Sequence, residues 1–231
     1  MERNGKQFYT KNKQLIDIST WDISSSPSIN ELENKYGWEG AMAYGNLIND
    51  ELNQHGPGIQ PGDVYLDLGA NVGMSALRAE LSGASKLYCI EPDPGVYEAL
   101  EMNKSDKWEN FNLAISDYDG EINIPKWPNW WEEVSRPCIT LENFFYSNKI
   151  SHIDYMKVDI EGHEIKIMPQ ISKAIYDKID KIFVEYHENT EIEDDERNKN
   201  RIKFIKSIES KGYNNHYVHL GWSQSFMYFW K

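Results

Sequence analysis

Residues 64–73, which read Val-Tyr-Leu-Asp-Leu-Gly-Ala-Asn-Val-Gly, decide the fold of this chain. The apolar run 64–66 predicts a buried strand, and residues 74–81 after the second glycine have a helical pattern. Gly69 and Gly73 allow the backbone to approach a ligand at the start of that helix, where free N–H groups and the helix dipole favour an anion. This strand, turn and helix predict a site for an adenosine-type cofactor.

An acidic residue at the end of the next predicted strand supports this interpretation. The apolar stretch 86–90 predicts a strand, and it ends at Glu91. In nucleotide-binding βαβ units an acidic side chain at this place accepts hydrogen bonds from ribose hydroxyls. The two motifs in register are much more specific than either one alone.

The composition predicts a single core. The chain has 231 residues, of which 40% are hydrophobic and 13% aromatic, enough for one sizeable core but not for two independent ones. We expect a helical N-terminal extension over residues 1–62, with helices at 28–36 and 40–52, followed by one α/β domain over residues 63–231.

Charge and cysteine content exclude several classes of partner. A formal net charge of -13 opposes long-range attraction to nucleic acids and anionic membranes, so neither is expected as a partner. Only Cys89 and Cys138 are present, which indicates a reducing compartment rather than a disulfide framework. The sequence shows no apolar stretch long enough to span a bilayer and no signal-peptide core, so we expect a cytoplasmic protein.

Strands and helices alternate along the rest of the chain, which predicts a doubly wound, mainly parallel sheet. The aromatic-rich end, residues 216–230, predicts an antiparallel edge of two strands. The other expected elements are a third strand at 111–115, a hairpin-like stretch at 120–124, helices at 96–103, 139–146, 164–176 and 202–211, and strands at 155–160 and 181–186.

Ligands of open α/β sheets bind beyond the carboxyl ends of the strands, so the residues at these ends define the expected site. Every predicted strand of the parallel sheet ends in polar or charged residues. They are Asp67 with the glycine loop, Glu91, Ser116 and Asp117, the run Asp159-Ile160-Glu161-Gly162-His163, and the run Glu185-Tyr186-His187-Glu188.

Taken together, these motifs resemble the FkbM family of S-adenosylmethionine-dependent methyltransferases. The likeness extends over roughly residues 63–190, and it rests on the runs at 66–73, 91–92, 114–117, 139–142 and 155–164. The resemblance implies a class I methyltransferase fold, which is Rossmann-like, and methylation of a hydroxyl, often on a sugar or glycan.

The resemblance also implies roles for individual residues. Asp67 would bond the amino group of the cofactor, Glu91 with Pro92 would hold the ribose, and Ser116 with Asp117 would bond the adenine edge. Asp159 and Glu161 would face the sulfonium and the acceptor. The methionine part would lie in the glycine loop, formed by Gly69, Ala70, Asn71, Val72, Gly73 and Met74.

A sugar hydroxyl is a poor nucleophile, so its proton must be taken by a base or its acidity raised by a divalent cation. Asp159, Glu185 and His187 are the candidate ligands for Mg²⁺ or Mn²⁺, which prefer oxygen-rich sites. Metal dependence stays open at this point. His187 and His163 are the candidate bases, and Lys157 is a weaker one because it must first lose its charge.

Alternative interpretations exist for single residues and for the whole chain. Asp67 could cap a helix, and His163 is more simply a helix-capping or surface residue. The segment Trp127-Pro128-Asn129-Trp130-Trp131 could form an aromatic wall for the acceptor, although a place in the core is the more usual role for any one of these tryptophans. Three alternative functions are an NAD-dependent oxidoreductase, a methyltransferase of another small molecule or a protein, and a non-enzymatic binding module. The oxidoreductase is disfavoured because Asn71 replaces the middle glycine of the G-x-G-x-x-G motif.

Overall fold

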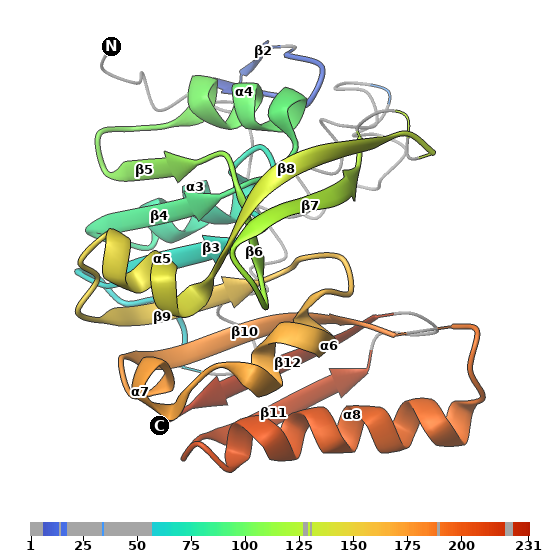
Figure 1. Ribbon diagram of the computed structural model, residues 1–231. Coiled ribbons are helices and arrows are strands. Elements are labelled where there is room, and N and C mark those ends of the chain that lie inside the picture. Colours follow the sequence, from blue (N-terminus) through green and yellow to red (C-terminus); the bar gives the residue numbers. More distant parts are fainter. Residues whose placement is uncertain are drawn as a thin grey trace.

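The computed structural model describes residues 7–13, 15–17, 34, 57–126, 129, 131–188, 190–219 and 224–231. At its centre is a seven-stranded sheet, with five parallel strands and an antiparallel end (Figure 1). The strands, in spatial order, are β11 (Asn214–His219), β12 (Gln224–Trp230), β10 (Ile179–His187), β9 (Ile153–Val158), β3 (Val64–Leu68), β4 (Lys86–Ile90) and β5 (Trp108–Phe111).

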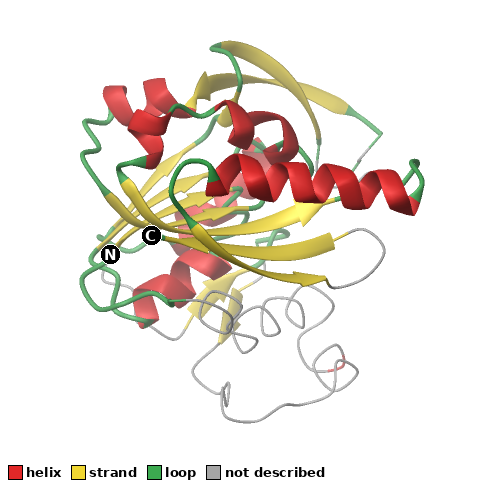
Figure 2. Ribbon diagram, turned by 90° about the horizontal axis from the view of Figure 1, so that it is seen from below, coloured by secondary structure: helices red, strands yellow, loops and turns green. Residues whose placement is uncertain are grey.

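Helices cover both faces of the sheet (Figure 2). The alternation of side chains along β3 shows the two layers, since Tyr65 belongs to one core and Leu66 and Leu68 to the other. The helices are α3 (Met74–Leu81), α4 (Pro94–Asn103), α5 (Leu141–Ser147), α6 (Glu164–Ile167), α7 (Lys173–Tyr176) and α8 (Asp194–Glu209). The predicted doubly wound, mainly parallel sheet with an antiparallel C-terminal edge is therefore confirmed.

The third strand is not where the sequence predicted it. Instead of one strand over 111–115, the structure has β5, which ends at Phe111, and a separate β6 (Ala114–Ser116). Trp108 at the start of β5 is buried in the core and pairs with Leu87. The side-chain amide of Asn112 donates to the carbonyls of Glu91 and Pro92, which fixes the bend between the two strands.

A small second sheet continues from β6. It consists of β6, β8 (Glu133–Thr140) and β7 (Gly120–Pro125), in which β7 and β8 form the antiparallel hairpin expected around 120–124. The helix predicted at 139–146 begins later, at Leu141, because residues 139–140 still belong to β8. Thr140 instead caps this helix by accepting a hydrogen bond from the backbone N–H of Asn143.

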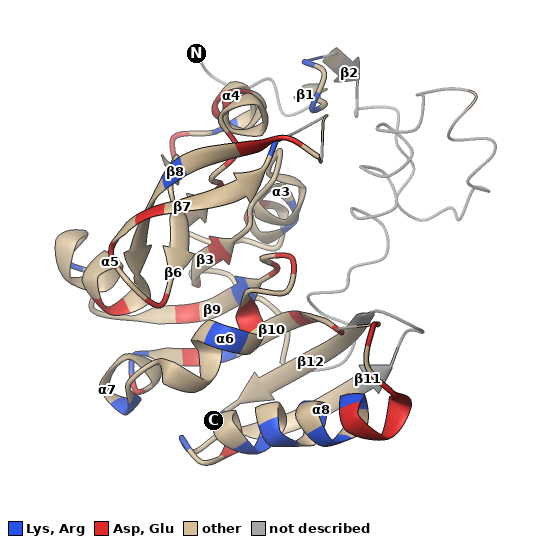
Figure 3. Cartoon of the chain, turned by 45° about the vertical axis from the view of Figure 1, so that its right-hand side comes forward, with Lys and Arg blue, Asp and Glu red and all other residues tan. Residues whose placement is uncertain are grey.

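Two further helices differ from their predicted form. The helix expected at 164–176 is divided into α6, a 3₁₀ turn η2 (Met168–Gln170) and α7. Pro169 contributes to the break because it has no N–H to continue the helical hydrogen bonds, and the chain leaves the helical conformation at Ile171, which has a ψ of 131°. The helix expected from residue 202 begins at Asp194, with an acidic first turn that suits the positive end of its dipole (Figure 3).

The described part of the N-terminal extension contains two strands and, at Asn34, one helical residue. Residues 7–17 contain two short antiparallel strands, β1 (Gln7–Tyr9) and β2 (Leu15–Asp17). Phe8 of β1 is fully buried in one of the two cores. The helices predicted at 28–36 and 40–52 lie outside the described residues, Asn34 apart, and the domain boundary after residue 62 stays a prediction. No described helix is long and apolar enough to cross a bilayer.

Candidate functional site

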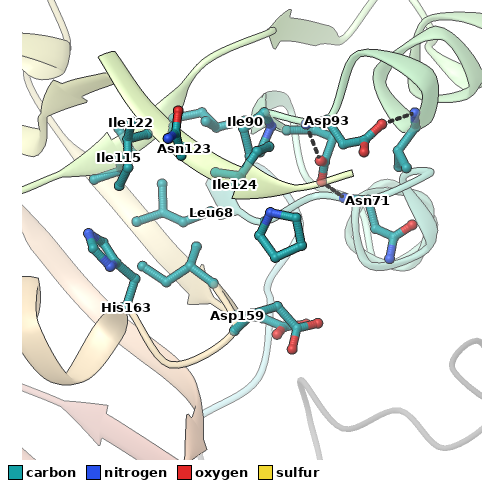
Figure 4. Close-up of a pocket in the computed structure, with 18 of the residues that line it drawn as sticks. Leu68, Asn71, Ile90, Asp93, Ile115, Ile122, Asn123, Ile124, Asp159 and His163 are labelled. Atoms are coloured by element: carbon teal, nitrogen blue, oxygen red, sulfur yellow. Dashed lines mark hydrogen bonds between the residues drawn. The ribbon is translucent and has the colours of Figure 1, made fainter. Parts of the chain in front are cut away.

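A pocket of about 490 Å³ opens at the carboxyl ends of β3, β4 and β9 (Figure 4). This is the edge at which the sequence placed the site. The pocket combines apolar walls with a few polar groups, as small-molecule sites do. Its lining residues are Lys11, Leu68, Gly69, Asn71, Ile90, Glu91, Pro92, Asp93, Val96, Ala114, Ile115, Ile122, Asn123, Ile124, Pro125, Asp159, Ile160, Glu161 and His163.

The glycine loop after β3 is held tightly against two neighbouring strands. The backbone N–H groups of Gly69 and Ala70 both donate to the carbonyl of Ile90, at 3.0 and 2.9 Å. Gly69 has a φ of 83°, and a Cβ there would lie 1.7 Å from the carbonyl oxygen of Asp159. Only glycine fits this position, because any side chain would collide with backbone.

Glu91 reaches the pocket from the end of β4. Its carboxylate accepts hydrogen bonds from the backbone N–H groups of Asn71, at 2.9 Å, and Asp93, at 2.8 Å. Burial raises the pKa of Glu91 to about 7, although these two hydrogen bonds oppose the shift. Glu91 therefore joins the glycine loop to the start of α4, where Asp93 is the N-cap.

A row of three charged side chains, of which Asp67 and Lys157 are buried and Asp159 lines the pocket, lies beneath the loop. Asp67 is fully buried, and Lys157 lies between it and Asp159, with its Nζ 3.6 Å from Asp67 Oδ1 and 3.0 Å from Asp159 Oδ2. Burial raises the pKa of Asp67 to about 6, and Lys157 opposes that shift. Burial disfavours the charge on Lys157, but the carboxylates of Asp159 and Asp67 outweigh it and raise the pKa of Lys157 above its usual range. Lys157 therefore keeps its proton and is unsuited to act as a base.

Glu164 is a site residue for which the sequence alone predicted no role. It is fully buried at the start of α6, and its carboxylate accepts from the backbone N–H of Gly162, at 2.9 Å, and that of His187, at 2.8 Å. The ring Nδ1 of His187 also lies 3.2 Å from the same carboxylate. The signal available in the sequence was an acidic residue directly after the strand-end run 159–163.

His187 lies between Glu164 and three other carboxylates. Its Nε2 is 3.6 Å from Glu161, 3.8 Å from Glu185 and 4.0 Å from Asp159. Burial opposes the charge on the ring, but Glu164 and the other acidic neighbours outweigh it and raise the pKa of His187 to about 9. The structure thus brings together the predicted residues Asp159, Glu161, Glu185 and His187.

Several of the predicted residues do not line the pocket, among them Asp67, Glu185 and His187. Ser116 and Asp117 do not line it, and Asp117 pairs instead with Lys166, at 2.9 Å. His163 does line the pocket, and its Nε2 lies 3.4 Å from the hydroxyl of Ser116. Ala70, Val72, Gly73 and Met74 belong to the glycine loop and the start of α3 without lining the cavity. Trp131 is 81% exposed, while Trp127 and Trp130 lie outside the described residues.

The strand order of the central sheet, with the pocket at the carboxyl ends of its parallel strands, is that of a class I methyltransferase. A solved structure described as an S-adenosylmethionine-dependent methyltransferase from Listeria monocytogenes superposes with a TM-score of 0.54, over 83% of this chain and 98% of that one. The sequence identity is 11%, so this likeness concerns the fold alone.

The family follows from the sequence. The Methyltransferase FkbM domain matches residues 67–214, so the chain belongs to the FkbM family of S-adenosylmethionine-dependent methyltransferases. One relative is the 31-O-demethyl-FK506 methyltransferase FkbM of Streptomyces tacrolimicus, 21% identical over 65% of this chain and 75% of that protein. Another is the hexuronic acid methyltransferase AglP of Haloferax volcanii, 25% identical over 57% of this chain and 59% of that protein.

The described residues fit S-adenosylmethionine. Asp67 lies fully buried beneath the glycine loop without lining the cavity, and none of the described groups hydrogen-bonds its carboxylate oxygens, which leaves them able to accept from an amino group. Gly69 leaves no side chain between the loop and the end of β9. Glu91 presents a carboxylate to a pocket whose other walls are largely apolar, which suits a ribose beside an adenine ring.

Proposed function

We propose that this methyltransferase acts on a hydroxyl group, and that the acceptor is a sugar or glycan. The observation that carries the proposal is the cluster of Asp159, Glu161, Glu185 and His187 beside the pocket. Asp159 and Glu161 also line the pocket, so carboxylate oxygens face the space that an acceptor would enter. The name of the first relative, which gives an oxygen position, supports transfer to oxygen, and the name of the second, which gives a hexuronic acid, supports a sugar acceptor.

Methyl transfer to oxygen requires that the acceptor be held in line with the methyl group and that its proton be accepted. Bound S-adenosylmethionine supplies the electrophilic methyl group. Asp159 and Glu161 are placed to accept a hydrogen bond from an acceptor hydroxyl. His187, which holds its own proton at neutral pH, places a positive charge beside these two carboxylates.

We also propose that a divalent cation, Mg²⁺ or Mn²⁺, binds in this cluster. The predicted ligands were Asp159, Glu185 and His187, and the ligand atoms of Asp159, Glu161 and His187 lie within 4.8 Å of one another. Glu164 behind the ring resembles the carboxylate that commonly orients a metal-binding histidine. Cation binding would displace the proton from Nε2 of His187, because only the neutral ring can be a ligand, and the bound cation would lower the pKa of an acceptor hydroxyl.

Chelation tests the cation proposal. Activity is expected to fall after treatment with EDTA and to return with Mg²⁺ or Mn²⁺, whereas affinity for S-adenosylhomocysteine is expected to stay the same. Undiminished turnover by protein that elemental analysis shows to be free of metal would contradict the cation proposal. It would leave the proposed acceptor untouched.

The acceptor is tested with radiolabelled S-adenosylmethionine and a panel of glycans, small phenols, peptides and RNA. Label is expected on a glycan hydroxyl. Label confined to peptides would instead favour a protein acceptor, as in the electron transfer flavoprotein beta subunit lysine methyltransferase of Xenopus laevis, which is 27% identical over 48% of its own length. Label confined to phenols would show that the hydroxyl assignment holds and that the sugar assignment is wrong.

A further inference from the structure

The turn between β1 and β2 reaches the cofactor pocket although it lies outside the family match, which begins at residue 67. Lys11 in this turn lines the pocket together with Asn71, Glu91 and Asp93. Figure 4 shows Asn71 and Asp93 at one end of the cavity. A segment distant in sequence thus brings a positive charge to the acidic end of the pocket.

The turn is fixed in place by a buried clamp. Asn103, at the end of α4, is almost fully buried. Its side chain accepts from the backbone N–H of Tyr9, at 2.7 Å, and donates to the carbonyls of Tyr9, at 2.7 Å, and Val72, at 2.9 Å. Because Val72 lies in the glycine loop, one side chain sets the position of β1 relative to that loop.

Several groups surround the carboxylate of Glu91. The backbone N–H groups of Asn71 and Asp93 donate to it, and the Asp93 carboxylate repels it. The charge of Lys11 also favours the ionised form of Glu91, with a smaller effect than that of the two backbone hydrogen bonds. Arg136 of β8 donates to the carbonyl of Pro92 and bonds the side chain of Asn112.

We propose that Lys11 is a positioning residue for the cofactor, which keeps Glu91 in the ionised form that accepts the two ribose hydroxyls. A carboxylate only accepts hydrogen bonds, whereas a protonated carboxyl loses acceptor capacity and gains a donor. Burial favours the protonated form of Glu91, and a nearby ammonium group opposes that effect. This inference rests on the S-adenosylmethionine dependence of the family and concerns a part of the chain that the family match does not include.

The consequence is a particular dependence of cofactor affinity on pH. Glu91 has a pKa near 7, and loss of Lys11 raises it further. If the rise is about one pKa unit, the ionised fraction of Glu91 in the variant falls about tenfold relative to wild type well below pH 7, and by less than about twofold above pH 8. The affinity ratio between wild type and variant should therefore grow as the pH falls.

Lys11→Met tests the proposal, with Lys13→Met as the matched control. Lys13 lies in the same turn, pairs with Glu98 on α4 and does not line the pocket. Calorimetric titration with S-adenosylhomocysteine at pH 6, 7 and 8.5 should show about tenfold weaker binding by Lys11→Met at pH 6 and nearly normal binding at pH 8.5. Lys13→Met should bind like wild type throughout, and Lys11→Arg, which keeps the charge, should restore the wild-type profile.

Two results would overturn the role of Lys11. One is a wild-type to Lys11→Met affinity ratio that stays the same across the pH range. The other is an equal, pH-dependent loss when Lys11→Met is made in a Glu91→Gln background, where no carboxyl remains to titrate. Circular dichroism and thermal unfolding verify that each variant is folded. If wild-type protein binds no S-adenosylhomocysteine at any pH, the cofactor assignment itself fails, which is a different outcome.

Discussion

Single residues at the strand ends carry the chemistry of this protein, and their neighbours decide whether they are charged. Asp67 and Glu91 are both buried acids, and burial raises the pKa of each. Lys157 forms an ion pair with Asp67, and the charge of Lys11 opposes the rise in the pKa of Glu91. The residue type was therefore predictable from the sequence, but the protonation state depends on contacts between distant segments.

Replacing Glu91 with alanine is expected to weaken cofactor binding. Loss of the partner of two buried hydroxyls costs on the order of 1–3 kcal/mol, which calorimetry with S-adenosylhomocysteine would measure. Glu109→Ala is a suitable control, because Glu109 is an exposed residue of β5 that pairs with Lys86 at the surface. Equal affinity of the Glu91→Ala variant and wild type would show that Glu91 does not bind the ribose.

Replacing Glu164 with glutamine is expected to lower kcat while affinity for S-adenosylhomocysteine changes little. The carboxylate accepts from Gly162 with one oxygen and from His187 with the other, and an amide can accept on only one of these sides. The ring of His187 would lose its fixed orientation. Steady-state kinetics at saturating cofactor measures the effect.

Glu142→Gln is the control for this experiment. Glu142 also accepts from a backbone N–H, that of Ser172, but it does not line the pocket. A normal kcat in folded Glu164→Gln protein would mean that Glu164 only stabilises the fold. A parallel loss in Glu142→Gln would assign the effect to general destabilisation.

At the scale of elements, the β7–β8 hairpin contributes to the pocket, although the sequence predicted the site only from residues at the strand ends. Alternate residues of β7 face opposite ways, so Ile122 and Ile124 are half-buried while Glu121 is exposed. Both isoleucines line the pocket. The second sheet therefore supplies an apolar wall, together with Asn123, to a cavity whose acidic groups follow the strands of the first.

Ile122→Ala and Ile124→Ala are each expected to weaken cofactor binding by about 1 kcal/mol or more, since each removes apolar surface from the pocket wall. Calorimetry with S-adenosylhomocysteine is the measurement. Glu121→Ala, on the outward face of the same strand, should bind normally. If all three substitutions had the same effect, the hairpin would act on the site only through its overall stability.

At the scale of the whole molecule, the raised pKa values predict how stability depends on pH. Asp67, Glu91 and His187 all have folded pKa values above their ordinary ones, at about 6, 7 and 9. Between the ordinary and the folded value of each group, the native state binds more protons than the unfolded state. The free energy of unfolding therefore falls as the pH rises, from about pH 4 to 7 for the two acids and from about 6.5 to 9 for the histidine.

Thermal unfolding of the cofactor-free protein is thus expected to have a higher midpoint at pH 6 than at pH 8.5. A Glu91→Gln variant should be less sensitive to pH between 5 and 7, because one of the titrating acids is gone. Differential scanning calorimetry in buffers of equal ionic strength measures both proteins. A midpoint that rises with pH over this range would contradict the assigned shifts.

The sequence by itself determined the central fold and the edge at which the pocket lies. Periodic apolar runs, glycines at 69 and 73 and acidic strand ends are local signals, because each reflects the backbone conformation or burial of a few neighbouring residues. They were sufficient to place β3, α3, β4, β9 and β10 and to predict that Asp159, Glu185 and His187 lie together.

Tertiary structure alone decided which predicted residues reach the pocket and which others join them. Asp117 is turned to Lys166, Glu164 is buried behind His187, and Lys11 arrives from a hairpin that Asn103 holds against the glycine loop. No local pattern encodes these contacts, since each joins segments that are far apart in the chain or separated by a turn. They depend on the packing of two sheets and an N-terminal hairpin around one cavity.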